Sequence, residues 1–133
     1  MIFSESELRL MDEAKEASEH AYSPYSKFKV GAAILTKKGN IYKSANIENA
    51  SYSLTICAER NAATKAVFNH DTDFELIAVY VDSEILFPPC GACRQFLSEF
   101  APTVPIIYFN KIDSYKYRLD ELLPFSFQLN DNQ

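Results

Sequence analysis

The chain has 133 residues, 47% of them apolar, and a formal net charge of -5. This length supplies one compact domain with its own core, so we expect a single domain over residues 1–133. No N-terminal stretch combines a basic start with an apolar run, and no segment approaches the roughly 20 apolar residues of a membrane helix. These absences predict a cytoplasmic protein that binds no membrane. No long block of Lys or Arg occurs, so a small-molecule partner is favoured over a nucleic acid.

The first third of the chain predicts one helix followed by a β-hairpin. Ser4 and Glu7 have the spacing of a capping box, and apolar residues then recur at helical spacing as far as Tyr22. Residues 28–36 and 41–46 have strand patterns, and the Lys-Lys-Gly-Asn segment between them is typical of a turn. These two strands are therefore expected to form a hairpin.

The remaining elements alternate between helices and short apolar strands. We expect a helix at 59–68, a buried strand at 75–81, a helix beginning near Pro89, a buried strand at 104–109, an edge strand around Tyr117 and a short helix at 119–123. Such alternation after a hairpin favours a mixed β-sheet with helices packed on it, which places the chain in the α/β class.

The three cysteines form the most informative pattern in the sequence. An odd number argues against a disulfide framework and leaves metal ligation, nucleophilic catalysis or core packing. Cys90 and Cys93 stand three residues apart at a predicted helix start, where both thiols point to one side and free backbone N–H groups stabilise thiolates. Cys57 begins another predicted helix. Two helix starts would then converge on one metal ion.

A metal held by these cysteines would have three protein ligands. A structural zinc site needs four, and neither His20 nor His70 lies in a comparable context, so one coordination position is predicted to stay open. An open position is typical of catalytic zinc, whose bound water ionises with a pKa of about 7 in favourable cases. Glu59, two residues after Cys57, is expected to act beside that water as general acid and base.

Each part of this pattern also has a simpler interpretation. A cysteine is commonly a small buried hydrophobe, a C-x-x-C pair is also a redox motif, and an acid in a first helical turn complements the helix dipole. A redox pair, however, is expected near a thioredoxin-like βαβ pattern, without a third thiol and an acid upstream. The combination of Cys57, Glu59, Cys90 and Cys93 therefore favours metal ligation.

Five segments, in order, resemble landmarks of the small homotetrameric class of zinc-dependent cytidine deaminases: SPYSKFKVGAA at 23–33, NIENASY at 46–52, CAER at 57–60, PCGACRQ at 89–95 and ELLP at 121–124. The resemblance implies a three-layer α-β-α sandwich with a mixed sheet of about five strands, and a Zn²⁺ ion in each subunit. It also implies hydrolytic deamination of cytidine and deoxycytidine to uridine and deoxyuridine with release of ammonia, a reaction of pyrimidine salvage. A homotetramer with sites shared between subunits is then expected.

A short polar segment and an aromatic residue are expected to contact the substrate. Asn46 and Glu48 alternate along an extended segment and so face one side, where they can meet a polar ligand; a solvated strand end is the alternative. The resemblance implies that both bind the sugar, chiefly its 3′-hydroxyl. It implies that Phe28 packs against the nucleoside, for which core packing is the alternative. It also implies that backbone groups near Ala58 and Pro88 hold the base.

The C-terminal LLP-x-x-F pattern adds a further aromatic residue. The resemblance implies that Phe127 reaches the site of a neighbouring subunit. Phe125 is an additional aromatic residue where the family often has a small one. Either ring is therefore a candidate for this contact.

Charge compensation at the metal points to an arginine. Three thiolates and a dication carry a formal net charge of -1, which weakens zinc as a Lewis acid relative to a site with a neutral histidine ligand. Arg60, next to Glu59, can donate hydrogen bonds to the ligand sulfurs and withdraw thiolate charge, and Arg94 is a weaker candidate. An ordinary exposed helix arginine is the alternative for both.

Three other functions share part of this pattern. A deaminase of polynucleotides needs a basic channel and stacking platforms, of which the acidic sequence gives no sign. A deaminase of a cytosine-containing antibiotic shares the zinc signature, but Asn46 and Glu48 favour a plain nucleoside. A non-catalytic zinc module would leave Glu59 and the open coordination position unexplained.

Overall fold

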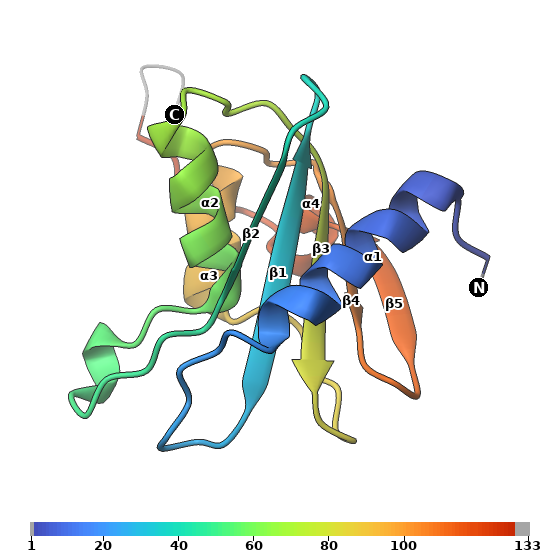
Figure 1. Cartoon of the computed structure of the whole chain (residues 1–133). Helices are drawn as coiled ribbons and strands as arrows, with labels where there is room; N and C mark the ends of the chain where they lie inside the picture. Colours follow the sequence, from blue (N-terminus) through green and yellow to red (C-terminus); the bar gives the residue numbers. More distant parts are fainter. Residues whose placement is uncertain (1, 130–133) are drawn as a thin grey trace.

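The computed structural model describes residues 2–129, which fold around a five-stranded sheet with the strand order β2-β1-β3-β4-β5 (Figure 1). The strands are β1 (Lys29–Thr36), β2 (Ile41–Ala45), β3 (Phe74–Asp82), β4 (Pro105–Phe109) and β5 (Ser114–Arg118). The helices are α1 (Glu5–Ser18), α2 (Ala58–Phe68), α3 (Gly91–Ser98) and α4 (Leu119–Leu122), with a 3-10 helix at Tyr52–Leu54. None of these helices, all within the described residues, has the length and apolar character that a membrane crossing requires.

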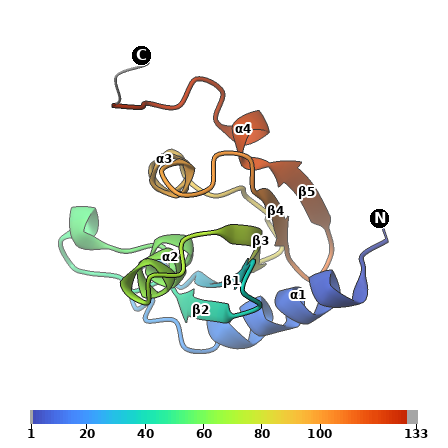
Figure 2. The same cartoon turned by 90° about the horizontal axis from the view of Figure 1, so that it is seen from above.

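Helices cover both faces of the sheet and give the fold three layers. Seen from above, α1 lies on one side of the sheet, whereas α2 and α3 lie on the other (Figure 2). Leu10 and Ala14 of α1 belong to the first apolar core, and Ala62 of α2 and Leu97 of α3 belong to the second. Only β3 and β4 pair in parallel, and the other neighbouring strands are antiparallel. The predicted α-β-α sandwich with a mixed sheet is therefore confirmed.

The central strand β3 is buried on both faces. Successive strand residues point to opposite sides of a sheet. Ile77 and Val79 accordingly join the core under α2 and α3, while Leu76 and Ala78 join the core under α1. This double burial explains why the middle of the strand, residues 76–81, is a continuous apolar run in the sequence.

Helix α1 approaches β1 closely because β1 contains a glycine. The predicted capping box is present at the start of α1, where Ser4 and Glu7 each accept a hydrogen bond from the other's backbone N–H. A Cβ atom placed on Gly31 would lie only 2.0 Å from the carbonyl oxygen of Ala14 and 2.4 Å from the backbone nitrogen of Ser18. Glycine is therefore required where helix and strand cross.

The predicted elements are all present, and the largest difference is at the end of α1. The sequence predicts a helix as far as Tyr22, but α1 ends at Ser18. The Tyr22 N–H instead donates to the carbonyl of Asn46 at 2.9 Å, and its carbonyl accepts from the N–H of Glu48 at 2.8 Å. Strand-type pairing replaces the last helical turn, and it holds the segment with Asn46 and Glu48 in place.

Candidate active site

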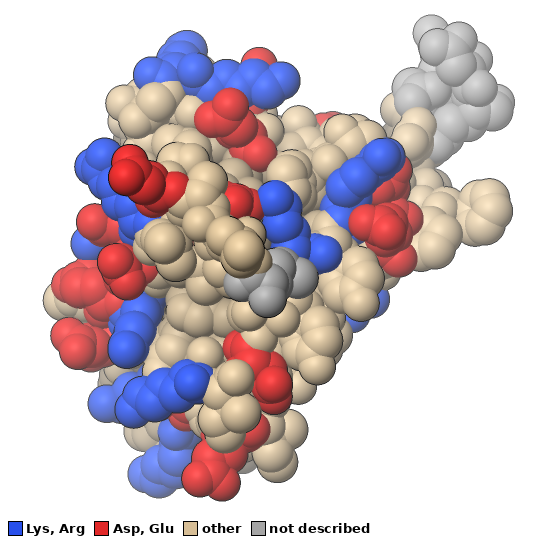
Figure 3. Space-filling model, turned by 90° about the vertical axis from the view of Figure 1, so that its right-hand side faces the viewer, with Lys and Arg blue, Asp and Glu red and all other residues tan. Residues whose placement is uncertain are grey.

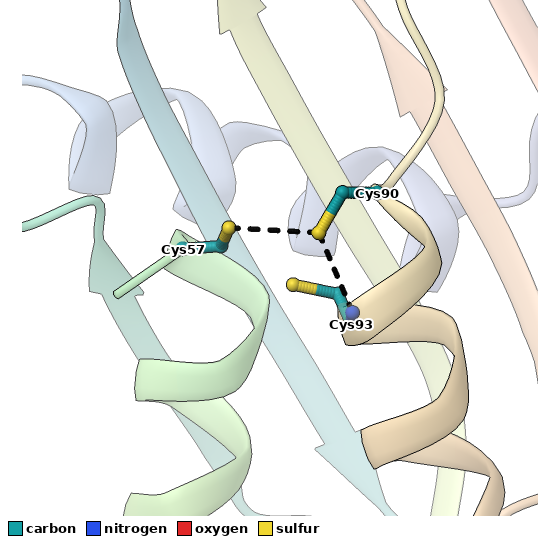
Figure 4. A group of neighbouring side chains, drawn as sticks. All are labelled: Cys57, Cys90 and Cys93. Atoms are coloured by element: carbon teal, nitrogen blue, oxygen red, sulfur yellow. Dashed lines mark hydrogen bonds between the residues drawn. The ribbon is translucent and has the colours of Figure 1, made fainter. Parts of the chain in front are cut away.

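Three cysteines converge where the N-termini of α2 and α3 meet. Cys57 is the N-cap residue of α2, Cys90 is the N-cap residue of α3, and Cys93 lies in the first turn of α3. Figure 4 shows the three thiols directed toward one another. Their sulfur atoms all lie within 4.8 Å of one another. The predicted convergence of two helix starts is confirmed.

The surroundings of the cluster favour ionisation of Cys57 over Cys93. The backbone N–H of Cys93 donates to the sulfur of Cys90 at 3.4 Å, and a helix N-terminus adds partial positive charge. A hydrogen bond from the Cys93 thiol lowers the pKa of Cys57 to about 5, against the effect of burial and with the help of Arg60. The same contact raises the pKa of Cys93. Of these two thiols, Cys57 is thus the one that ionises first.

The donor set fits a zinc ion with one open coordination position. Tetrahedral Zn²⁺ with Zn–S distances of about 2.3 Å places its sulfur ligands about 3.8 Å apart. The sulfur atoms of Cys57 and Cys90 are 3.8 Å apart. No fourth His, Cys, Asp or Glu belongs to the cluster among residues 2–129, so a tetrahedral ion would keep one position for water or substrate.

Arg60 contacts the cluster, whereas the guanidinium of Arg94 is engaged elsewhere. The Nη2 atom of Arg60 donates to the sulfur of Cys57 at 3.8 Å, which is the contact expected from the sequence. Arg94 donates from Nε to the carbonyl of Pro89 at 2.8 Å and from Nη1 to the carbonyl of Leu122 at 2.7 Å. Arg94 therefore connects the loop before α3 to the end of α4.

Glu59 is a buried carboxyl group beside the thiols. It lies in the first turn of α2, and only 4% of the residue is exposed. Burial, followed by the charge of Cys57, raises the pKa of Glu59 to about 7. A carboxyl group with such a pKa can accept and release a proton near neutral pH.

A cavity of about 230 Å³ gives access to these groups. Glu59, Cys57 and Cys90 line it together with three residues predicted from the sequence to contact the substrate, Phe28, Asn46 and Ala58. Most of the remaining wall is apolar and comes from β1, β3 and the loop before α3, with Val30, Val79, Val81, Phe87, Pro88 and Pro89. Such a wall suits a planar ring with a few polar groups.

Phe87 is a wall residue that sequence analysis did not identify. Its ring packs edge-on against that of Phe28, with centroids 5.9 Å apart and an interplanar angle of 77°. Both rings remain partly exposed and line the cavity. The position of Phe87 directly before the Pro-Pro-Cys motif was the available signal, but local sequence alone does not distinguish a cavity wall from a core aromatic residue.

Asn46 and Glu48 are buried and hold the loop that leads into β1. Asn46 accepts from the Val30 N–H and donates to the Phe28 carbonyl, both at 2.9 Å. Glu48 accepts from two backbone N–H groups of the loop, both at 3.0 Å, and from the Ser26 hydroxyl. Burial raises the pKa of Glu48, but these hydrogen bonds outweigh it and the net shift is downward. Glu48 is therefore an anionic acceptor.

The two polar residues line adjoining cavities. Asn46 lines the cavity beside the thiols, and Glu48 lines a second one of about 360 Å³. Ser26 and Thr55 border both cavities, so the two spaces are neighbours. The structure thus brings Asn46 and Glu48 to the same region, but it places each on a different part of the wall.

Phe125 and Phe127 lie away from the thiols of the same chain. Both are strongly exposed, and neither lines the two cavities described above. They belong to the tail after α4, which passes α3 on the side opposite to the sheet (Figure 2).

The surface in Figure 3 has no continuous basic patch, because Lys and Arg alternate there with Asp and Glu. Ion pairs of the same mixed kind include Lys43 with Glu13 and with Glu16, each at 2.7 Å. This face is therefore unsuited to a polyanionic backbone.

Comparisons with known proteins agree with the geometry of the site. Residues 4–109 match the family model of the cytidine and deoxycytidylate deaminase zinc-binding region. A cytidine deaminase of Halalkalibacterium halodurans is 47% identical over 124 residues, which cover 92% of this chain and 94% of the relative. A blasticidin-S deaminase of Bacillus cereus is 33% identical and covers 96% of both chains.

A solved structure extends the agreement to the fold. The crystal structure of cytidine deaminase from Burkholderia pseudomallei has a TM-score of 0.87 at 40% identity and covers 94% of this chain and 100% of that one. The zinc-binding region of the family model includes all three thiols, so the expected zinc cofactor is confirmed. From its sequence match, its fold and its thiol cluster, the chain belongs to the cytidine and deoxycytidylate deaminase family.

Proposed function

We propose that the chain is a zinc-dependent cytidine deaminase that hydrolyses cytidine and deoxycytidine to uridine and deoxyuridine and releases ammonia, as in pyrimidine salvage. The observation that carries the proposal is the buried Glu59 carboxyl group, which lines the same cavity as Cys57 and Cys90. Relatives named cytidine deaminase, 46% and 47% identical over 92% of the chain, support this reaction.

Glu59 moves the protons in this reaction. The ligands Cys57, Cys90 and Cys93 would hold Zn²⁺, which lowers the pKa of a water molecule toward neutrality and thereby supplies the nucleophile. Glu59 accepts a proton from the attacking water and delivers it to ring N3 as the oxygen attacks C4. The same carboxyl group then carries the remaining proton of the attacking water to the amine, which leaves as ammonia. Burial is the largest cause of the raised pKa of Glu59, and a pKa near neutrality suits a group that must both accept and donate a proton.

The apolar cavity orients the base. The rings of Phe28 and Phe87 supply flat contact surfaces, and backbone groups of Ala58 and Pro88 hold the polar edge of the pyrimidine. Arg60 donates to the sulfur of Cys57 and withdraws charge from the metal ligands.

Asn46 and Glu48 bind the sugar, chiefly its 3′-hydroxyl. An ionised carboxylate accepts about four hydrogen bonds, and Glu48 uses three of these within the protein. Asn46 similarly keeps one N–H and one acceptor position after its contacts with Val30 and Phe28. Each side chain therefore has capacity for a ribose hydroxyl, and the adjoining cavity provides the space.

The active unit in this proposal is a homotetramer of single-domain chains, each covering residues 1–133. Phe127 completes the site of a neighbouring subunit, and its exposed ring, which does not line its own cavity, supports this role. Phe125 lies in the same tail and remains the alternative. The use of reduced thiols as metal ligands supports a reducing compartment, the cytoplasm.

One relative favours a second candidate substrate. The blasticidin-S deaminase of Bacillus cereus covers 96% of the chain at 33% identity, so a cytosine-containing antibiotic is the rival of a plain nucleoside. The higher identity of the relatives named cytidine deaminase favours cytidine.

A substrate panel tests the proposal. Zinc-loaded protein is incubated separately with cytidine, deoxycytidine, adenosine, CMP and blasticidin S, while ultraviolet absorbance and ammonia are followed. We expect ammonia from cytidine and deoxycytidine at rates well above those for the other compounds. Ammonia release from blasticidin S alone would show that the antibiotic, and not a nucleoside, is the substrate. Absence of ammonia release from every compound by zinc-loaded protein would refute the proposed reaction.

A further inference from the structure

The tail after α4 is held against α3 by a side-chain amide. Described residues 124–127 contain no helix or strand, and none of their described contacts is a backbone–backbone hydrogen bond. Gln95 of α3 donates from Nε2 to the carbonyl of Phe127 at 2.9 Å and accepts at Oε1 from the Phe127 N–H at 3.0 Å. One amide thus pairs with both backbone polar groups of Phe127.

Gln95 lies on the same helix as the metal-binding thiols of α3, so this contact links the tail to the metal cluster. Gln95 lies two residues after Cys93 on α3, and the buried side chain of Leu97 packs the same helix into the core. Because Cys90 caps α3 and Cys93 lies in its first turn, the helix that positions two of the three thiols also holds the Phe127 backbone.

A second contact holds the end of α4, from which the tail leaves. Arg94, the neighbour of Gln95 on α3, donates to the carbonyl of Leu122 at 2.7 Å. Between the two contacts, Phe125 has a φ of 57°, a conformation that a phenylalanine seldom adopts. Contacts at Leu122 and Phe127 therefore restrain the short segment between them, which includes the unfavourable backbone conformation of Phe125.

The contact restrains the backbone of Phe127 and leaves its ring free. The residue is 69% exposed although both of its backbone polar groups are paired. Because the backbone is held, the exposed ring projects from a defined place on the surface.

We infer that Gln95 is a positioning residue, which fixes the Phe127 backbone to the metal-binding helix so that the Phe127 ring is placed to enter the site of a neighbouring copy. This inference rests on the proposed function, in which Phe127 completes that site. When the segment that carries the ring is already ordered, substrate binding loses less conformational entropy. Gln95 is therefore expected to act on KM rather than on kcat.

Hydrogen exchange resolved to the Phe127 amide tests the contact independently of activity. In the zinc-loaded wild-type protein, this N–H should exchange at least about tenfold more slowly than in Gln95→Met, which keeps the side-chain length but removes both hydrogen bonds. Gln95→Glu keeps the acceptor for the Phe127 N–H but places a carboxylate oxygen opposite the Phe127 carbonyl, so it should retain only part of the protection. Equal exchange in the wild type and Gln95→Met would overturn the inference.

Kinetics test the positioning role. We expect Gln95→Met to raise KM for cytidine about three- to tenfold, with kcat and zinc content within about twofold of the wild type. In a Phe127→Ala background, the same change should add no further increase, because Gln95 acts through Phe127. Glu19→Gln, an exposed change at the end of α1 on the other side of the sheet, is the control and should change neither exchange nor KM.

The outcomes separate this inference from the proposed function. A Gln95→Met protein with wild-type KM, or an additive effect with Phe127→Ala, would overturn the positioning role while cytidine turnover by the wild type stands. Absence of cytidine turnover by the zinc-loaded wild type would instead refute the proposed function, and the exchange of the Phe127 amide would still report on the contact.

Discussion

Arg60 donates hydrogen bonds to the sulfur of Cys57 at 3.8 Å and to the carbonyl of Thr55 at 3.2 Å. The first contact places a positive charge beside a ligand set that is formally negative with zinc bound. The second holds the guanidinium in that position. In the proposed function, Arg60 therefore acts on the metal through Cys57, and the carbonyl of Thr55 orients the guanidinium.

Replacing Arg60 by alanine should weaken zinc binding. Loss of a group that supports a metal ligand typically costs about 10- to 100-fold in metal affinity or activity. Competition with a chromogenic chelator measures zinc affinity, and Arg9→Ala, an exposed change on α1, is the matched control. Wild-type zinc affinity and activity in Arg60→Ala would exclude the assigned role.

Replacing Glu59 by glutamine should abolish most turnover without removing the metal. The amide keeps the size of the buried side chain but cannot carry a proton, and general acid-base catalysis contributes about 10²- to 10⁴-fold. We expect kcat for cytidine to fall by at least this factor, with zinc content unchanged by elemental analysis. Substantial deamination by zinc-loaded Glu59→Gln would contradict the assignment of the proton carrier.

The metal cluster could be predicted from sequence because its signals are local. Cys57 and Glu59 are two residues apart, and Cys90 and Cys93 are three apart, so the start of a helix is enough to set each pair. The central strand was predictable for a similar reason, since β3 contains an unbroken apolar run from Leu76 to Val81.

Other features of the site depend on how distant segments pack. Phe87 lines the cavity because the loop before α3 packs against Phe28, and no local sequence pattern indicates this tertiary contact. Arg60 and Arg94 both follow a metal-ligating cysteine closely, yet the directions of their guanidinium groups differ with the surroundings of α2 and α3. Spacing alone therefore left both arginines as candidates.

Replacing Phe87 by alanine should weaken substrate binding. The ring supports Phe28 from the side, and an aromatic pair contributes about 0.5–1.5 kcal/mol beyond the buried area, so KM for cytidine should rise about two- to tenfold. Steady-state kinetics measure this effect. Phe68→Ala removes an 84% exposed ring at the end of α2 and should leave KM unchanged. An unchanged KM in Phe87→Ala would mean that the base does not depend on this wall.

Replacing Gly31 by alanine should destabilise the fold. The new Cβ atom would stand 2.0 Å from the carbonyl oxygen of Ala14, and backbone cannot rotate away as a side chain can. Overpacking of this kind costs about 1–3 kcal/mol of unfolding free energy. Urea unfolding at a fixed protein concentration measures it. Gly91→Ala, where a Cβ atom meets nothing within 4 Å, is the control, and equal stability of the two variants would contradict the prediction.

Asp71 joins the end of α2 to the hairpin turn through a buried carboxylate. Its Oδ2 atom accepts from the Thr36 hydroxyl at 2.9 Å, the Asn40 amide at 2.9 Å and the Tyr42 hydroxyl at 3.1 Å. The hydrogen bond from Asn40 is the largest cause of a lowered pKa of Asp71, with those from Thr36 and Tyr42 acting in the same direction against burial. The folded state therefore favours the ionised carboxylate.

The stability that Asp71 contributes should depend on pH in a defined direction. Because its folded pKa lies below the unfolded value of about 3.9, the contribution is complete above that value and is lost as pH falls through the folded pKa. Asp71→Asn should thus lower the urea midpoint at pH 7, and its difference from the wild type should shrink in strongly acidic solution. Asp73→Asn, at an exposed carboxylate near Lys37, should show a much smaller difference at both pH values. A difference between wild type and Asp71→Asn that stays constant with pH would assign the effect to shape rather than to the charge of the carboxylate.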